Sequence, residues 1–198
     1  MSLPGSVTSA TGVDAMVHAI EAYTSRLKKN PMSDMLAKEA LSLLGKNLLQ
    51  VCKNPDDVSA RTNCLLGSMY AGMAFANAPV GAVHALAYPI GSHFHVPHGL
   101  SNSIMLPHVL KYNEPVAKSM YSELRQILFP NKSAATLSEC FVDLALELEM
   151  PQKLSQVGVS EGDLPTLVSE SMKQTRLLPN NPREVRPEDA LQIYSDAL

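Results

Sequence analysis

The chain has 198 residues, of which 45% are hydrophobic and 18% charged, a composition that argues against disorder and suits one domain or two small ones. Lysine and arginine number 16 against 19 aspartate and glutamate, so the net charge is −3. This near-balance argues against a broad electrostatic surface for nucleic acid or an anionic membrane.

The residue usage predicts an all-α protein. Leucine and alanine total 47 residues, whereas valine and isoleucine total only 20. Leucine and alanine are good helix formers, and β-branched residues prefer strands. No stretch alternates polar and apolar residues over the length of a strand for long. We therefore expect a bundle-like domain of several helices.

The predicted helices follow one another along the whole chain. The first covers residues 12–25, and the second begins at Asn30 and Pro31, since asparagine caps helices and proline fits the first helical position. The later elements are 58–78, 81–94, a helix from Pro97 towards 112 with a kink at Pro107, weaker segments at 115–128, 134–149 and 159–175, and a last helix that opens at Pro187 with Glu188 and Asp189 in its first turn.

Apolar spacing predicts which side chains are buried. One buried stripe is expected on the second helix, at Met32, Met35, Leu36, Leu43, Leu44 and Val51. Four methionines of the chain are expected to fill the core: Met16, Met69, Met73 and Met105.

Histidine placement is the most informative feature of the sequence. Four of the six histidines fall within fifteen positions: His84, His93, His95 and His98. A fifth, His18, follows Asp14 by four residues, a spacing that puts both side chains on one face of a helix. One carboxylate with several imidazoles suits iron, zinc, cobalt or nickel better than calcium or magnesium.

A purely structural interpretation stays open for each of these residues. Asp14 and His18 could form a simple hydrogen-bonded pair, His84 could be a satisfied core histidine, and His98 could only mark a helix end. His108 is expected to be structural. The loop before Pro97 is expected to hold His93 and His95, where a cleft-lining role is the alternative.

Several kinds of site are missing from the sequence. The ten glycines never fall two apart, so neither the dinucleotide fingerprint nor a phosphate-binding loop can form here. The three cysteines are scattered, which argues against a disulfide framework or a cysteine zinc site and favours a reducing, cytoplasmic compartment. No apolar run approaches the roughly 20 residues of a membrane span.

Several segments resemble signature regions of the iron-containing (group III) alcohol dehydrogenases. Residues 11–23 (TGVDAMVHAIEAY) resemble the first metal-binding helix of that family. The family's second signature is similar to three segments, residues 72–77 (GMAFAN), 84–91 (HALAYPIG) and 97–99 (PHG). The family's C-terminal loop is similar to residues 181–183 (NPR). The resemblance covers essentially the whole chain.

The resemblance implies a site and a reaction. The implied ligands are Asp14, His18, His84 and His98, and the implied ion is Fe(II) or another divalent metal such as zinc. The implied reaction is hydride transfer between a small alcohol or aldehyde and NAD or NADP. Several family members carry a histidine at the position of Tyr88 that helps relay a proton. Tyr88 is therefore a candidate catalytic or pocket residue, with His95 as a possible substitute in the relay.

The resemblance also implies a domain organisation. Residues 1–198 correspond to the family's helical metal-binding domain, and the N-terminal α/β domain that binds NAD(P) is absent from this chain. We therefore expect the chain to bind about one divalent metal and to have little activity alone. Two alternatives stay open: a glycerol dehydrogenase, maleylacetate reductase or hydroxyacid–oxoacid transhydrogenase of the same fold, and a non-catalytic helical metal-binding domain. A homo-oligomer is possible if apolar surface is exposed.

Overall fold

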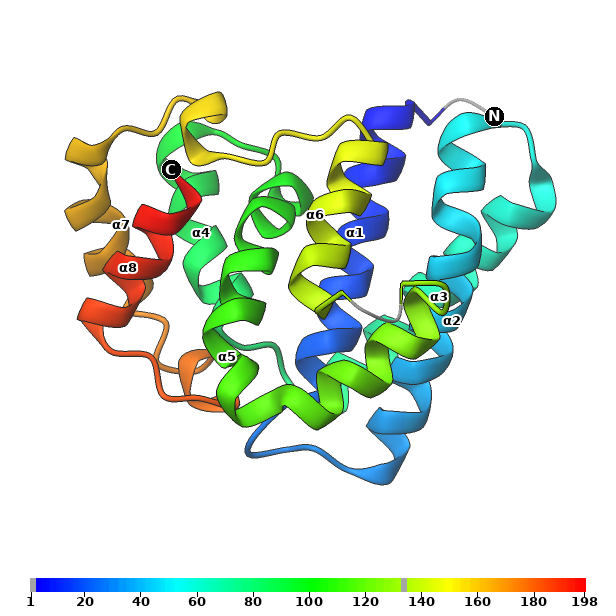
Figure 1. The fold of residues 1–198 in the computed structure, drawn as a ribbon, viewed down its shortest axis with the longest axis horizontal. Coiled ribbons are helices and arrows are strands. Elements are labelled where there is room, and N and C mark those ends of the chain that lie inside the picture. The colour runs from blue at the N-terminus through cyan, green and yellow to red at the C-terminus, as the bar shows by residue number, and fades with distance from the viewer. Residues whose placement is uncertain (1–2, 133–134) are drawn as a thin grey trace.

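The computed structural model describes residues 3–132 and 135–198, and within these ranges the chain folds into helices without a strand (Figure 1). The all-α prediction is therefore confirmed. The helices are α1 (Gly5–Tyr23), α2 (Pro31–Lys53), α3 (Val58–Asn77), α4 (Ala82–Phe94), α5 (His98–Leu128), α6 (Leu137–Glu147), α7 (Leu164–Ser171) and α8 (Pro187–Ala197), with short 3-10 turns at Leu154–Val157, Glu161–Asp163 and Leu178–Asn180.

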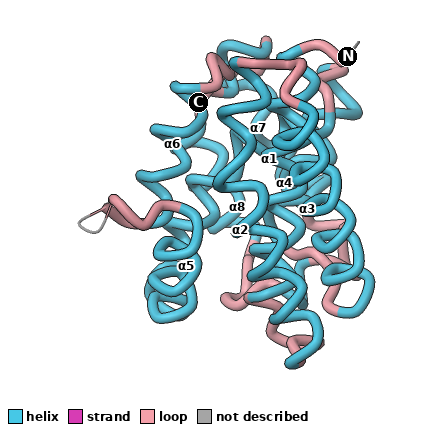
Figure 2. The backbone as a smooth tube through the Cα atoms, turned by 90° about the vertical axis from the view of Figure 1, so that its right-hand side faces the viewer, coloured by secondary structure: helices cyan, strands magenta, loops and turns pink. Residues whose placement is uncertain are grey.

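Helix α1 lies at the centre of the molecule, where it packs against α2, α3 and α5 (Figures 1 and 2). Small and apolar residues occupy nearly all of its sides, and a helix that is apolar all round is buried. It begins at Gly5 rather than at the predicted Gly12. The added first turns contain threonines whose hydroxyls are satisfied by the backbone: Thr8 Oγ1 donates to the Pro4 carbonyl (3.0 Å) and Thr11 Oγ1 to the Val7 carbonyl (2.8 Å).

Helix α2 begins where the sequence predicts. The Asn30 side chain accepts a hydrogen bond from the Ser33 amide (2.9 Å), and Pro31 occupies the first turn. Its predicted stripe is only partly right, because Met32 and Met35 are exposed. The buried face uses small residues that let neighbouring helices approach closely, and it consists of Ser33, Ala37, Ala40, Leu41, Leu44, Leu48 and Val51.

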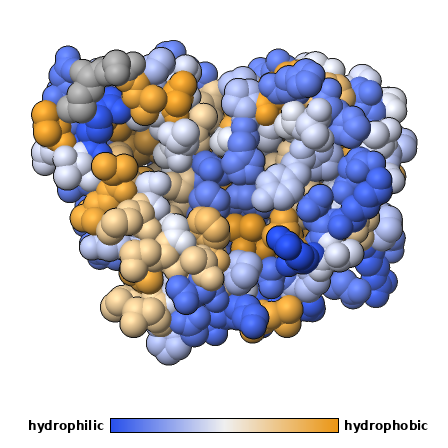
Figure 3. Space-filling view, turned by 180° about the vertical axis from the view of Figure 1, so that it is seen from behind, coloured by the Kyte–Doolittle hydropathy of each residue, from blue (hydrophilic) through white to orange (hydrophobic). Residues whose placement is uncertain are grey.

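The outer face of α3 is apolar. Leu65, Met69 and Met73 follow one another at intervals of four residues, and their exposed fractions are 73%, 51% and 47%. Figure 3 shows apolar side chains gathered on the side of the molecule that carries this helix. The prediction that Met69 and Met73 fill the core is therefore wrong, whereas Met16 and Met105 are buried as expected.

Helix α5 continues through two prolines. It was expected to end near Tyr112, but it runs unbroken to Leu128 and includes the segment predicted as a separate helix at 115–128. Figure 1 shows that its two halves run in different directions. Pro107 and Pro115 each remove a backbone donor and crowd the preceding turn, which explains the change of direction. Burial on both sides of the prolines keeps the helix intact.

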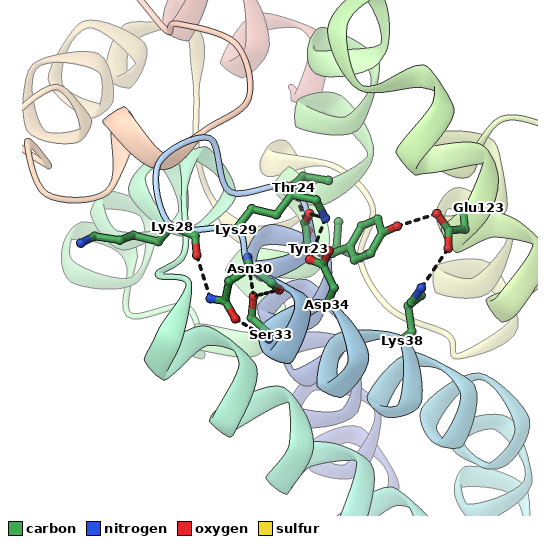
Figure 4. Close-up of polar contacts among 10 residues, drawn as sticks. Tyr23, Thr24, Lys28, Lys29, Asn30, Ser33, Asp34, Lys38 and Glu123 are labelled. Atoms are coloured by element: carbon green, nitrogen blue, oxygen red, sulfur yellow. Dashed lines mark hydrogen bonds and ion pairs between the residues drawn. The ribbon is translucent and has the colours of Figure 1, made fainter.

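A polar cluster fastens the end of α1 to its neighbours (Figure 4). The Tyr23 hydroxyl donates to Glu123 of α5 (2.5 Å), and Lys38 of α2 donates to the same carboxylate (3.2 Å). Lys29 lies 3.6 Å above the Tyr23 ring and donates to Asp34 (2.7 Å). These contacts hold the turn that leads from α1 into α2.

The three remaining helices pack on α4 and α5: α6 and α8 contact α5, and α7 contacts α4. Helix α6 forms within the predicted segment 134–149 and is shorter than that segment. Residue 134 lies outside the described residues. The predicted segment 159–175 holds a 3-10 turn followed by the short helix α7, and α8 begins at Pro187 as expected. No helix in the described ranges is long and apolar enough to cross a membrane.

Candidate metal centre

Three polar side chains lie along one line of the buried helix α1. Asp14, His18 and Glu21 are separated by four and three residues, so they share one face. This face points towards α4 and α5, where two further histidines meet it. A polar stripe on an otherwise apolar central helix is costly unless each group has a partner, so the partners of these three residues define the site.

His84 lies in the first turn of α4 and is buried. Its Nδ1 is 2.6 Å from Glu21 Oε2, and the other Glu21 oxygen accepts the Val83 amide (2.7 Å). A carboxylate only accepts hydrogen bonds, so the proton of this contact belongs to Nδ1 of the histidine. The opposite nitrogen, Nε2, is buried and has no hydrogen-bond partner among residues 3–132 and 135–198.

His98 begins α5 and brings a third imidazole to the same place. Its Nε2 lies 3.7 Å from Asp14 Oδ1, and the Nε2 of His84 lies at the same distance from that oxygen. The amide nitrogen of Asn102, one turn further along α5, donates to Asp14 Oδ1 (2.6 Å) and lies 3.2 Å from His98 Nε2. Asn102 therefore fixes the carboxylate in front of the two histidines.

The fourth group, His18, is held between two rings. It stacks on Phe75 of α3 with 4.4 Å between ring centroids and on His84 with 4.6 Å. Burial lowers the pKa of His18 to about 4, although the nearby Asp14 acts in the opposite direction. The imidazole is therefore neutral at pH 7, which is the state that a metal ligand requires.

The four side chains converge closely enough to share one ion. One ligand atom from each of Asp14, His18, His84 and His98 can be chosen so that all lie within 4.8 Å of one another. The free Nε2 of buried His84 and the mixed carboxylate and imidazole donors both fit a divalent transition metal.

The remaining residues of the prediction divide into two groups. Tyr88 follows His84 by one turn and reaches the site, since its ring centroid lies 6.1 Å from that of His84 and 5.7 Å from that of His98. Desolvation, with smaller effects of Glu21 and Asp14, raises the pKa of its hydroxyl. The histidines that lie outside the cluster of possible ligands are His93, His95 and His108.

One of those histidines differs from its predicted setting. His93 belongs to the last turn of α4 rather than to a loop. His95 follows α4 in the loop before Pro97, as predicted, and its backbone is in the left-handed region with φ of 56°. About three turns of α4 separate His95 from His84, so it is not placed to replace Tyr88.

Three residues that support the site were missed by the sequence analysis, and a signal exists for two of them. Glu21 continues the spacing of Asp14 and His18 by one more turn, and Asn102 follows His98 by four residues. Both positions are therefore on the same helix faces as the candidate ligands. Phe75 had no such signal, because its contact with His18 depends on how α3 packs on α1.

Comparison with known proteins identifies the family. The model of the Fe-containing alcohol dehydrogenase family, C-terminal, matches residues 8–198. Long-chain-alcohol dehydrogenase 1 of Geobacillus thermodenitrificans is 37% identical over all of this chain and 51% of its own length. The 1,3-propanediol dehydrogenase of Klebsiella pneumoniae is 33% identical over 98% of this chain and 51% of its own length.

Solved structures agree with the sequence comparisons. A crystal structure of 1,3-propanediol oxidoreductase has a TM-score of 0.94 and 31% identity, and it covers 100% of this chain and 53% of its own. The chain thus spans about half the length of the curated relatives that it matches. Because the family model, the relatives and the solved structure agree, and the site geometry fits them, the chain belongs to the iron-containing alcohol dehydrogenase family and corresponds to the C-terminal part of its members.

Proposed function

We propose that this chain carries the divalent metal site of a NAD(P)-dependent alcohol dehydrogenase, with Asp14, His18, His84 and His98 as the ligands. The observation that carries the proposal is the convergence of these four side chains on one point, where the buried Nε2 of His84 lacks another partner in the described part of the chain. The substrate class that the relatives' names support is an alcohol, since one relative is named for long-chain alcohols and another for 1,3-propanediol.

The donor set favours Fe(II) or zinc over calcium or magnesium, because three of the four ligands are imidazoles. When bound, such an ion would supply Lewis acidity to a substrate oxygen, and a nicotinamide nucleotide would supply the hydride chemistry. Asp14 contributes the one negative charge among the four proposed ligands. Asn102 keeps that carboxylate oriented by its hydrogen bond.

We expect the substrate to bind on the solvent-exposed side of the site, where His98 lies. The His98 side chain is 48% exposed, whereas the His84 side chain is only 2% exposed. Tyr88 stands beside His98 on this open side and is itself partly exposed. We propose that Tyr88 contacts the substrate and donates a hydrogen bond to its oxygen, because a hydroxyl with a raised pKa keeps its proton at neutral pH.

The nucleotide is proposed to bind mainly to protein outside these 198 residues. No Gly-x-Gly sequence occurs in the chain, so the usual backbone cradle for a pyrophosphate is missing here. The chain alone should therefore bind metal and show little dehydrogenase activity. Rates of aldehyde reduction by the isolated chain with NADH and NADPH test this point, and rates as high as those of the full-length relatives would contradict it.

Elemental analysis of protein purified without chelator tests the ligand assignment. The unaltered chain is expected to hold about one divalent ion, and His84→Ala and His98→Ala are expected to hold none. His93→Ala is the matched control, because this histidine lies on α4 but outside the cluster. Unchanged metal content in both ligand variants would show that the assignment is wrong.

A further inference from the structure

Glu21 is a buried charged residue that the proposed ligand set does not use. It is 7% exposed, and its side chain extends from the last turn of α1 to the first turn of α4. Both of its carboxylate oxygens accept from α4: Oε2 faces Nδ1 of His84 at 2.6 Å, and Oε1 accepts the Val83 amide at 2.7 Å. A charge that is buried away from water is costly unless it is paired, and these two contacts give each oxygen of the carboxylate a partner.

One of the two contacts completes the start of α4. The residue before this helix is Gly81, which has no side chain to cap it. Val83 is the second residue of the helix, and its amide is one of those that a capping side chain would normally bind. Glu21 supplies the missing acceptor from another helix, and its negative charge is favourable at a helix N-terminus.

The other contact decides which nitrogen of His84 is free. The histidine must donate from Nδ1 to the carboxylate, so its lone pair lies on Nε2, the atom 3.7 Å from Asp14. The same residue thus fixes the position of the first turn of α4 and the protonation of the histidine within it.

We propose that Glu21 is a positioning residue that fixes His84 as the Nδ1–H tautomer and caps α4, so that Nε2 is presented to a divalent ion. The metal part of this inference rests on the proposed function. Outer-shell carboxylates of this kind orient metal-binding histidines and raise their basicity. Asp14 and Glu21 each bring one negative charge to the site. Together they balance the two positive charges of a divalent cation.

The geometry explains why a carboxylate is needed rather than an amide of the same shape. Val83 and His84 both offer N–H donors, and a carboxylate has an acceptor for each. Glutamine has one acceptor and one donor group. If its oxygen serves Val83, its amide group donates to Nδ1 and moves the imidazole proton to Nε2, where it blocks metal binding.

The variant Glu21→Gln therefore tests the inference with two measurements. Long-range ¹H–¹⁵N NMR of the metal-free chain reports the tautomer of His84 directly. Titration with Co(II) alone, followed by its visible absorption, reports affinity. We expect the Nδ1–H tautomer in the unaltered chain, the Nε2–H tautomer in the variant, and about a 10-fold to 100-fold weaker Co(II) affinity in the variant.

Two further variants separate this role from general destabilisation. Glu21→Asp keeps both acceptors, so it should retain the Nδ1–H tautomer and recover part of the affinity. Glu123→Gln is the matched control, because Glu123 also accepts two hydrogen bonds between helices but lies in the cluster around Tyr23. It should leave both the His84 tautomer and the Co(II) affinity unchanged.

The outcomes distinguish this inference from the proposed function. An Nε2–H tautomer of His84 in the unaltered chain overturns the inference, and so does an unchanged Co(II) affinity in a folded Glu21→Gln. If the unaltered chain binds no Co(II), the proposed metal site is wrong. In that case the NMR comparison still decides whether Glu21 sets the tautomer.

Discussion

The close approach of α1 and α5 at Gly99 leads to a prediction about the whole site. Gly99 follows His98, and a Cβ added there would lie 2.4 Å from the Ala10 carbonyl oxygen and 2.7 Å from its carbon. Ordinary contact begins at 3.4 Å, so Gly99→Ala forces these backbones apart by up to about 1 Å. The two helices carry Asp14 and His98, so the variant should separate these two proposed ligands.

Overpacking of this kind costs about 1–3 kcal/mol of unfolding free energy. For a chain of this size, each kcal/mol changes Tm by about 2–4 °C, which predicts a Tm lower by about 2–12 °C. Thermal unfolding followed by circular dichroism measures this change. Co(II) titration below Tm is expected to show weaker binding, because the obstacle is backbone rather than a flexible side chain.

Gly72→Ala is the matched control for Gly99→Ala. A Cβ at Gly72 on α3 would meet nothing within 4 Å, so replacement there should stabilise the helix by about 0.5–1 kcal/mol and leave Co(II) affinity unchanged. If Gly99→Ala unfolds and binds Co(II) as Gly72→Ala does, the close packing of α1 on α5 does not control the site. The reasoning from this contact would then be refuted.

Three other predictions concern stability. Hydrogen bonds, first from Tyr23 and then from Lys38, lower the pKa of Glu123, so their stabilisation is present above pH 4.5 and is lost as the pH falls below it. Between about pH 7 and pH 3, the unfolding free energy of Tyr23→Phe should therefore fall less than that of the unaltered chain. The difference should be well under 1 kcal/mol, because the Glu123 carboxylate is exposed, and thermal unfolding at the two pH values measures it. Asn30→Ala removes the cap of α2 and should cost about 1 kcal/mol in urea unfolding, whereas an unchanged midpoint would contradict the capping role. Chelation of the metal-loaded chain should lower its Tm, because an ion at 100 times its Kd adds about 2.7 kcal/mol, and His84→Ala should show no such change.

Local chemistry was enough to predict the class of the fold and several helix starts. The helix-forming composition predicted an all-α chain, and Asn30 and Pro187 mark helix starts because caps and first-turn preferences depend on residues adjacent in sequence. The ends of α1 and α5 were placed less well. Helix α1 accommodates hydroxyl residues in its first turns because their side chains bond to the backbone, and burial on both sides carried α5 across Pro115.

Part of the candidate site also follows from spacing alone. Asp14 and His18 share a helix face by the geometry of the α-helix, and Glu21 could have been found by the same rule. Histidine and aspartate at such positions indicate a possible metal site without showing that separate helices meet. Only the packing of α4 and α5 on α1 brings His84 and His98 within reach of Asp14.

Burial was decided by tertiary structure. Met69 has the same apolar character as Met16, yet Met69 is on the surface and Met16 is in the core. A residue's hydrophobicity is a property of its side chain, but its burial depends on which helices cover it. Helical periodicity says which residues share a face, whereas the contacts between distant helices decide whether that face meets protein, solvent or an ion.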